Sequence, residues 1–274
     1  MNKTVARRVI KAAAMQNMRG NWLSAFAITL IQTLLAMLIL GFFPLRIPLE
    51  QELINAAGNP LMVLSLFLPQ VITAKTITLM VVTVILYLLV MCPFSVGVGR
   101  FFLKIARGEK ARFSDVFSVF TNIRTVFASV LLNILITLLG VFWSVFALLM
   151  PMLALAAGFF IKSAFLIFVG TLFLFVAMVF CGLWVSRYNF AIYIFADRGQ
   201  GAFAALRDCI RLLSGRNGEI LLLRASYFGW DIASTYIPAL SFVYRALSGT
   251  VYAKYIYYLT GQLSIGETET PPEV

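Results

Sequence analysis

The sequence contains no histidine and only three cysteines among its 274 residues. Cys92, Cys181 and Cys209 stand alone, with no Cys-x-x-Cys spacing and no histidine to complete a zinc site. Glycine-rich phosphate-binding motifs, the GxSxG motif and paired carboxylates on one face of an apolar segment are also lacking. These absences argue against metal, nucleotide and acyl-transfer chemistry. We therefore expect a non-enzymatic protein with no cofactor and no metal.

Charged residues are scarce as well. They make up 12% of the chain, against about 25% in soluble domains, and 61% of the residues are hydrophobic. A water-soluble fold cannot hide so much apolar surface, so the composition indicates an integral membrane protein. Lys and Arg number 22 against 11 Asp and Glu, but they lie in short stretches between apolar runs. This arrangement predicts membrane topology rather than binding of nucleic acid.

Six apolar segments are long enough to cross a bilayer, which takes about 20 residues. We expect spans at about 21–43, 76–98, 126–156, 162–186, 219–236 and 239–262. Pro151 and the small residues up to Gly158 mark where the long run 126–185 reverses, and we favour a reversal near Gly158 to Lys162. Pro238 is placed to open the sixth helix, although one helix kinked there would leave five spans. The expected fold is an all-α polytopic transmembrane helix bundle with short amphipathic cytoplasmic helices.

Basic residues near the ends of the spans predict the orientation of the chain. Most of the 22 lie in the segments 1–20, 100–124 and 187–216, which share one side if the spans alternate. We expect that side to be the cytoplasm, with a cytoplasmic N-terminus. The end of the chain, 264–274, is expected to be a disordered acidic tail.

Three of the cytoplasmic segments have the pattern of amphipathic helices, namely 1–20, 100–124 and 199–215. The last is the most regular: Phe203, Leu206, Ile210 and Leu213 recur at helical spacing, and Arg207 and Arg211 lie off that stripe. This helix can lie in the headgroup layer, where Arg207 and Arg211 would contact anionic lipid headgroups. The same apolar face can equally pack against the cytoplasmic ends of the bundle, and the sequence favours neither arrangement, because both bury the same stripe.

Charges within the predicted spans are candidates for a polar intramembrane site, because each is costly unless it is paired or faces water. They are Arg224 and Asp231 in span five and Arg245 in span six. Asp231 and Arg245 are each seven residues from Pro238, so they should lie at one depth and form a pair. Such a pair would serve an ion-coupled or polar site, or it would fix the register of the last two helices. We favour the structural role, because a lone pair is weak evidence of transport.

Several motifs of the chain resemble those of a known family. They include Tyr188, Tyr193 and Asp197 in SRYNFAIYIFAD, then AALRDCIRLLSG, ASYFGW and GTVYAKYIYYL, with GNW and FFLKIARGEKARFSDVFSVF nearer the N-terminus. They are similar to the bacterial integral membrane family named domain of unknown function 975, and the similarity covers most of the chain. The resemblance implies a six-span bundle in the bacterial cytoplasmic membrane and supplies no activity.

Three classes of function follow from these features. We expect a membrane-organising or accessory subunit, because the loops are short and the basic segments amphipathic. The alternative is a small transporter or lipid-handling protein in which Arg224, Asp231 and Arg245 line a polar site, and a membrane-embedded enzyme comes third. The expected partners are the lipid bilayer with its anionic headgroups, and a membrane-protein partner or a second copy of the chain, but not nucleic acid.

Overall fold

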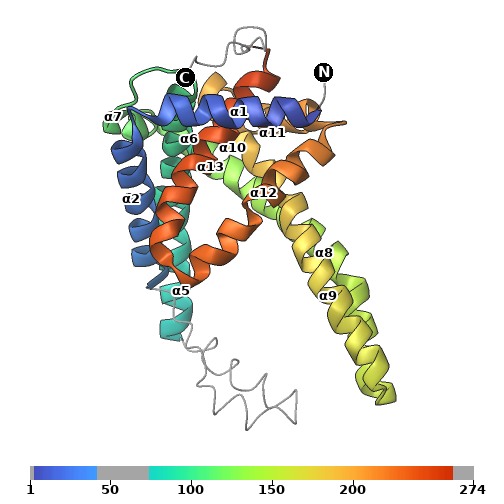
Figure 1. Cartoon of the computed structure of the whole chain (residues 1–274). Coiled ribbons are helices and arrows are strands. Elements are labelled where there is room, and N and C mark those ends of the chain that lie inside the picture. Colours follow the sequence, from blue (N-terminus) through green and yellow to red (C-terminus); the bar gives the residue numbers. More distant parts are fainter. Residues whose placement is uncertain (1–2, 42–73, 262–274) are drawn as a thin grey trace.

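The computed structural model describes residues 3–41 and 74–261, without the side chains of 3–8, 228, 231, 235, 236, 238, 239 and 241. This part of the chain is all-helical (Figure 1). The helices are α1 (Lys3–Met18), α2 (Trp22–Gly41), α5 (Ala74–Leu86), the π-helix η1 (Tyr87–Met91), α6 (Cys92–Ala106), α7 (Phe113–Phe117), α8 (Ile123–Ile161), α9 (Ala164–Val185), the 3₁₀-helix η2 (Ser186–Asn189), α10 (Phe190–Arg198), α11 (Ala202–Leu213), α12 (Asn217–Tyr236) and α13 (Pro238–Leu259). The predicted acidic tail lies outside the described residues.

Four helical stretches are long and apolar enough to cross a membrane, which identifies a membrane protein by length and composition. They are Trp22–Gly41, Ala74–Ala106, Ile123–Ile161 and Ala164–Arg198. The two further predicted spans, α12 and α13, are helices of 20 and 22 residues. They carry several charged residues, Glu219, Arg224 and Asp231 in α12 and Arg245 and Lys254 in α13, and are not among the four. The prediction of about six spans therefore stays a prediction.

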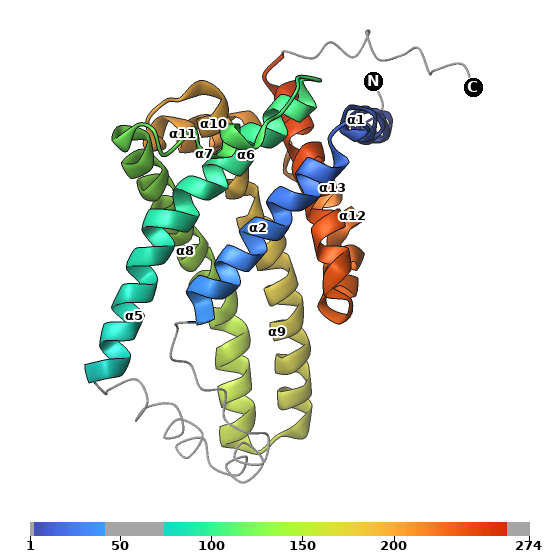
Figure 2. The ribbon, with the colours of Figure 1, turned by 90° about the vertical axis from the view of Figure 1, so that its left-hand side faces the viewer.

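Helices α8 and α9 form a long antiparallel hairpin that extends away from the other helices (Figure 2). Helix α8 continues through Pro151 and ends at Lys162, which has a left-handed conformation with φ 54°. Ser163 then caps α9, and its hydroxyl accepts a hydrogen bond from the backbone N–H of Leu166. Gly158 allows the two helices to approach, because a Cβ there would lie 2.9 Å from the backbone nitrogen of Ile167. The chain thus reverses at Lys162 and Ser163, at the end of the predicted reversal near Gly158 to Lys162.

A second, shorter hairpin is formed by α12 and α13, and Figure 1 shows its turn well short of the α8–α9 turn. Ile237, with φ −124° and ψ 88°, is non-helical between the two helices, and Pro238 occupies the first turn of α13. The fixed φ of proline suits that position, where its missing N–H leaves no hydrogen bond unmade. The prediction that Pro238 opens this helix is confirmed.

Helix α1 lies crosswise over one end of the bundle, at the same end as α7 and α11 (Figure 1). We refer to this end of the bundle as the α1 end. Its buried face, Ile10, Ala14 and Met18, packs on α13 and α6. The carbonyl of Ala106, at the end of α6, accepts hydrogen bonds from Asn17 Nδ2 at 2.9 Å and from Lys254 Nζ at 2.7 Å. The last turn of α6 therefore ties α1 and α13 to one point.

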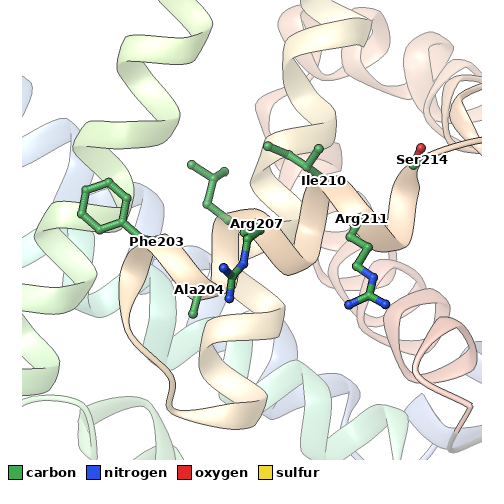
Figure 3. A pocket seen from close by; sticks show the side chains of 7 residues that line it. Phe203, Ala204, Arg207, Ile210, Arg211 and Ser214 are labelled. Atoms are coloured by element: carbon green, nitrogen blue, oxygen red, sulfur yellow. The ribbon is translucent and has the colours of Figure 1, made fainter.

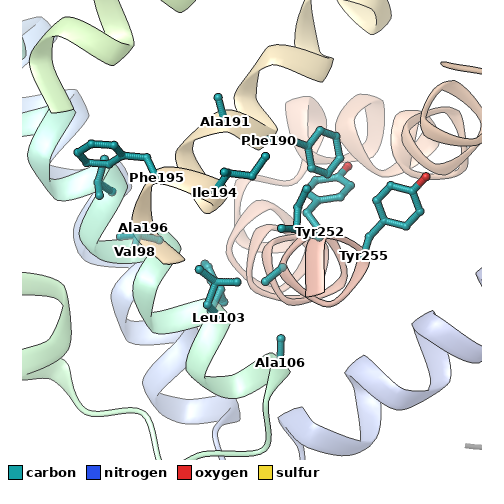
Figure 4. Close-up of a cluster of buried hydrophobic side chains, with 14 of the residues drawn as sticks. Val98, Leu103, Ala106, Phe190, Ala191, Ile194, Phe195, Ala196, Tyr252 and Tyr255 are labelled. Carbon is teal, nitrogen blue, oxygen red and sulfur yellow. The ribbon is translucent and has the colours of Figure 1, made fainter. Parts of the chain in front are cut away.

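The hydrophobic core is concentrated near the α1 end, where α6, α10 and α13 meet (Figure 4). Phe190 of α10 lies between the rings of Tyr252 and Tyr255, with centroids 5.4 and 6.1 Å away. Aromatic side chains bury large areas in such contacts and so fix the packing of the helices.

Three ion pairs join short helices at the α1 end. Lys104 pairs with Asp115, Arg107 with Asp197 and Arg198 with Asp208, which link α6 to α7, α6 to α10 and α10 to α11. Gly97 permits the contact between α6 and α7, because any Cβ at that position would overlap the carbonyl of Val116. The basic residues predicted to set the topology thus also hold this end of the bundle together.

Candidate functional site

A set of polar side chains inside the bundle surrounds a cavity of about 440 Å³, which we call the central cavity. It lies between α2, η1, α6, α8, η2, α10, α12 and α13, and it is lined by Thr29, Gln32, Thr33, Ala36, Tyr87, Met91, Ser95, Val98, Gly99, Phe102, Asn133, Asn189, Ile192, Tyr193, Arg224, Arg245, Ser248, Gly249 and Tyr252. The residues of η1 and α6 that line it lie about 6 to 28 Å along the helix from Ala106, at about 1.5 Å per residue. The central cavity therefore occupies the middle of the bundle and the half toward the α1 end.

Two of the predicted site residues, Arg224 and Arg245, come together on the wall of the central cavity. Among the described residues that line it, none is acidic. A pocket between membrane helices that presents two guanidinium groups favours a ligand with negative charge.

Arg224 contacts Ser186 and Tyr252 and also lines the central cavity. Its Nη2 donates to the carbonyl of Ser186 at 3.0 Å, and its guanidinium lies 4.7 Å from the centre of the Tyr252 ring. Such stacking stabilises a cation in a region with little water. The buried Nε of Arg224 has no hydrogen-bond partner among the described residues. A buried N–H without an acceptor is costly.

Arg245 reaches across the central cavity from α13 to α2. Its Nη1 donates to the hydroxyl of Thr33 at 3.3 Å, and that hydroxyl donates in turn to the carbonyl of Thr29 at 2.9 Å. The predicted partner of Arg245 is Asp231, whose side chain lies outside the described residues. The Asp231–Arg245 pair therefore stays a prediction, while Thr33 is a partner that the sequence does not indicate.

Neutral polar groups complete the wall. Gln32, Asn133 and Asn189 line the central cavity from three different elements. Asn133 uses its Nδ2 to donate to the carbonyl of Ser129, and its amide oxygen has no hydrogen-bond donor among the described residues. Amides that face a cavity can both donate and accept, so they suit a ligand with oxygen atoms of either kind.

The π-helix η1 shapes the far end of the central cavity. Pro93 follows η1 and has no N–H, so the ordinary helical ladder cannot continue through this point. The N–H of Cys92 instead bonds to the carbonyl of Tyr87, five residues back. This wider turn carries Tyr87 and Met91, both of which line the central cavity. Single π turns inside α-helices are frequent at functional sites.

The predicted lipid contacts, Arg207 and Arg211, lie elsewhere, on the exposed face of α11 at the α1 end (Figure 3). The predicted apolar stripe is divided in the structure: Leu206 and Leu213 are buried, but Phe203 is 64% and Ile210 48% exposed. The prediction that all four apolar residues would be buried together, either in the membrane surface or against the bundle, is therefore wrong. Helix α11 buries one apolar face and exposes a second beside its arginines. Ala202, Ala205 and Cys209 supply the small buried residues that the stripe omits.

Several cavity residues escape prediction from the sequence. Gln32 and Thr33 are adjacent polar residues within one long apolar run, and Asn133 is a single polar residue within another. Uncharged polar residues in such runs often bond to neighbouring helices, so they form a weak signal for a cavity. Met91-Cys92-Pro93 inside a predicted span is a stronger signal, since proline disturbs a helix at a definite point.

Comparison of the chain with protein-family models, with curated proteins and with solved structures found no match. The resemblance to domain of unknown function 975 is therefore an expectation carried by the sequence motifs. The fold and the central cavity define the class: a helical membrane protein with an arginine-lined polar cavity among its helices.

Proposed function

We propose that this protein binds an anionic ligand within the membrane and acts as a lipid-handling protein or small transporter. The central cavity carries the proposal, because Arg224 and Arg245 both line it and no described lining residue is acidic. Basic pockets between transmembrane helices bind the headgroups of anionic lipids when they lie toward the cytoplasmic side. We place the α1 end at the cytoplasm of a bacterium, on the basis of the basic residues and the family resemblance.

The cavity changes the order of the functions that the sequence suggests. An accessory subunit has no need of a polar cavity, and guanidinium groups within predicted membrane spans are costly without a compensating role. Each guanidinium has five N–H donors, and one nitrogen of each is hydrogen-bonded to a described residue. The remaining donors can bind the oxygen atoms of a phosphate or carboxylate.

A membrane-organising role remains the second candidate, and α11 favours it. Phe203 and Ile210 are exposed beside Arg207 and Arg211 at the α1 end. An exposed apolar and basic face of this kind suits the headgroup layer, where each basic residue contributes about 1 kcal/mol. Such a face would hold the end of the bundle at the membrane surface without any ligand in the cavity.

Mass spectrometry of the intact protein, purified with the lipids and small molecules that accompany it, tests the proposal. We expect anionic adducts on the wild type, which Arg245→Gln loses because one of the two cavity charges is removed. Arg124→Gln is the matched control, since Arg124 is exposed and does not line the cavity. The same adducts on all three proteins would contradict an anion site in the central cavity.

A further inference from the structure

A second hollow, which we call the side groove, lies beside the central cavity. It has a volume of about 380 Å³ and is lined by Leu40, Thr83, Val84, Tyr87, Leu88, Cys92, Asn133, Ile134, Thr137 and Leu138. These residues come from α2, from the stretch α5–η1–α6 and from α8. From Thr83 to Cys92 the groove follows the helix for about 13 Å, at about 1.5 Å per residue.

The side groove and the central cavity share two lining residues, Tyr87 and Asn133. The two spaces therefore lie next to each other at η1, where the helix widens before Pro93. Their chemistry differs on the two sides of this junction. Arginine and amide groups line the central cavity, whereas aliphatic side chains predominate in the side groove.

The side groove opens on the surface of the bundle that would face lipid. Leu40 is 55% exposed and Leu138 is 60% exposed, although both are large and apolar. Within a bilayer such side chains contact acyl chains at no cost, so the groove is accessible from the membrane. A hydrocarbon chain can reach it sideways without passing through water.

We infer that the ligand of the central cavity is an anionic glycerophospholipid, with its headgroup between Arg224 and Arg245 and one acyl chain in the side groove. This inference rests on the function proposed above and names the substrate class. A polar, cationic space next to an apolar one, with Tyr87 and Asn133 lining both, is complementary to an amphiphile with a negative head. A cavity of about 440 Å³ with amides as well as arginines suits a headgroup that carries hydroxyl groups better than a bare carboxylate.

Binding of phosphatidylglycerol with different chains to the full-length protein tests the inference. The probes are dioleoyl phosphatidylglycerol, dihexanoyl phosphatidylglycerol, oleate and glycerol phosphate, which separate the lipid from a fatty acid and from a free phosphate. Since binding strength grows with buried apolar area, the wild type should bind the dioleoyl lipid at least about tenfold more tightly than the dihexanoyl lipid. Oleate and glycerol phosphate should bind more weakly than the dioleoyl lipid.

Thr137→Trp fills the side groove from an exposed position of α8. It should remove the preference for long chains while the affinity for the dihexanoyl lipid stays within about twofold of the wild type. Val145→Trp is the matched control, because Val145 is exposed on the same helix and does not line the groove. It should behave as the wild type, which also shows that a new tryptophan on α8 does not disturb the fold.

The outcomes separate this inference from the function on which it rests. Equal affinity of the wild type for the two phosphatidylglycerols, or an unchanged chain preference in Thr137→Trp, would overturn the side groove as the chain site. The anion site would still stand if Arg245→Gln weakened binding of the dihexanoyl lipid. Tighter binding of oleate than of phosphatidylglycerol would overturn a phospholipid as the ligand. Unchanged binding in Arg245→Gln would overturn the proposed function itself.

Discussion

Arg245 of α13 donates a hydrogen bond from Nη1 to the hydroxyl of Thr33 of α2, across 3.3 Å. The contact joins the last helix to the first predicted span, and it lies on the wall of the central cavity. A charge from one end of the sequence is thus oriented by a hydroxyl more than 200 residues away. Pairing of Arg245 with Asp231 on the neighbouring helix α12 remains a separate prediction.

A double-mutant cycle distinguishes the two partners of Arg245. Asp231→Asn should destabilise the protein by several kcal/mol if it leaves Arg245 unpaired, and Arg245→Gln in the same chain should recover part of that loss. Thr33→Val should couple to Arg245→Gln by about 1 kcal/mol, as expected for one partly exposed hydrogen bond. Thermal unfolding in detergent measures each effect. Strictly additive losses for Asp231 and Arg245 would show that these two residues do not interact.

The α6–α7 junction should be sensitive to acid through Asp115. Partial burial of this carboxylate raises its pKa, but hydrogen bonds from Lys104 Nζ at 2.7 Å and the Arg112 backbone N–H at 2.8 Å outweigh that effect, and the pKa is lowered. The stabilisation is therefore present above the unfolded pKa of about 3.9 and is lost as the pH falls through the folded value.

Asp115→Asn should consequently lower stability by about 1.5–3 kcal/mol at neutral pH, the range for hydrogen bonds to charged groups. The difference from the wild type should shrink as the pH falls below about 3.9 and disappear only below the lowered folded pKa. Chemical unfolding at a series of pH values measures it, with Asp208→Asn as a comparison at another ion pair of the α1 end. A loss that is the same at every pH would show that the charge of Asp115 is irrelevant.

Labelling of introduced cysteines tests the topology. In a chain whose three native cysteines are alanine, Ala164→Cys and Ile237→Cys place exposed thiols at the turns of the two hairpins. Both should react with an impermeant reagent from outside the cell, whereas Lys110→Cys and Thr260→Cys should not. Ile237→Cys that fails to react would mean that α12 and α13 do not cross the membrane, and reaction of Lys110→Cys from outside would reverse the orientation.

The exposed face of α11 should lie in the lipid headgroup layer. A spin label at Phe203→Cys should collide more often with oxygen, which dissolves in lipid, than with a water-soluble nickel chelate. Arg216→Cys, exposed in the segment between α11 and α12, is the control and should show the opposite preference. If both labels behave as in water, the face instead contacts a partner protein or the cytosol.

Periodicity and proline chemistry predict the helices of this protein well. The 3.6-residue pattern predicts a helix within 199–215, and the structure has α11 there at Ala202–Leu213, because a helix on a protein surface must bury a face. Pro238 marks the start of α13 because its ring is compatible with a first turn and not with a helix interior. These features are local, so they can be derived from neighbouring residues alone.

The central cavity is not local, and only its arginines could be predicted. Arg224 and Arg245 are conspicuous because charge is costly within a membrane span. Gln32, Thr33 and Asn133 become meaningful only when α2 and α8 are packed around the same space. Similarly, the contacts of α11 with α10 and α8 decide which of its apolar residues are buried and which form the second, exposed face. The spacing of apolar residues along α11 does not specify these contacts.

The affinity of dihexanoyl phosphatidylglycerol for four forms of the protein, measured by titration calorimetry, tests the anion site most directly. The forms are the wild type, Arg224→Lys, Arg224→Gln and Arg245→Gln. We expect each Gln variant to bind about tenfold more weakly, which corresponds to about 1.4 kcal/mol for the loss of a charged donor. Arg224→Lys should be intermediate, because it keeps the charge but loses the planar, forked donor geometry of the guanidinium. Equal affinities in all four forms, or tighter binding of a phosphatidylcholine with the same chains, would contradict an anion site in the central cavity.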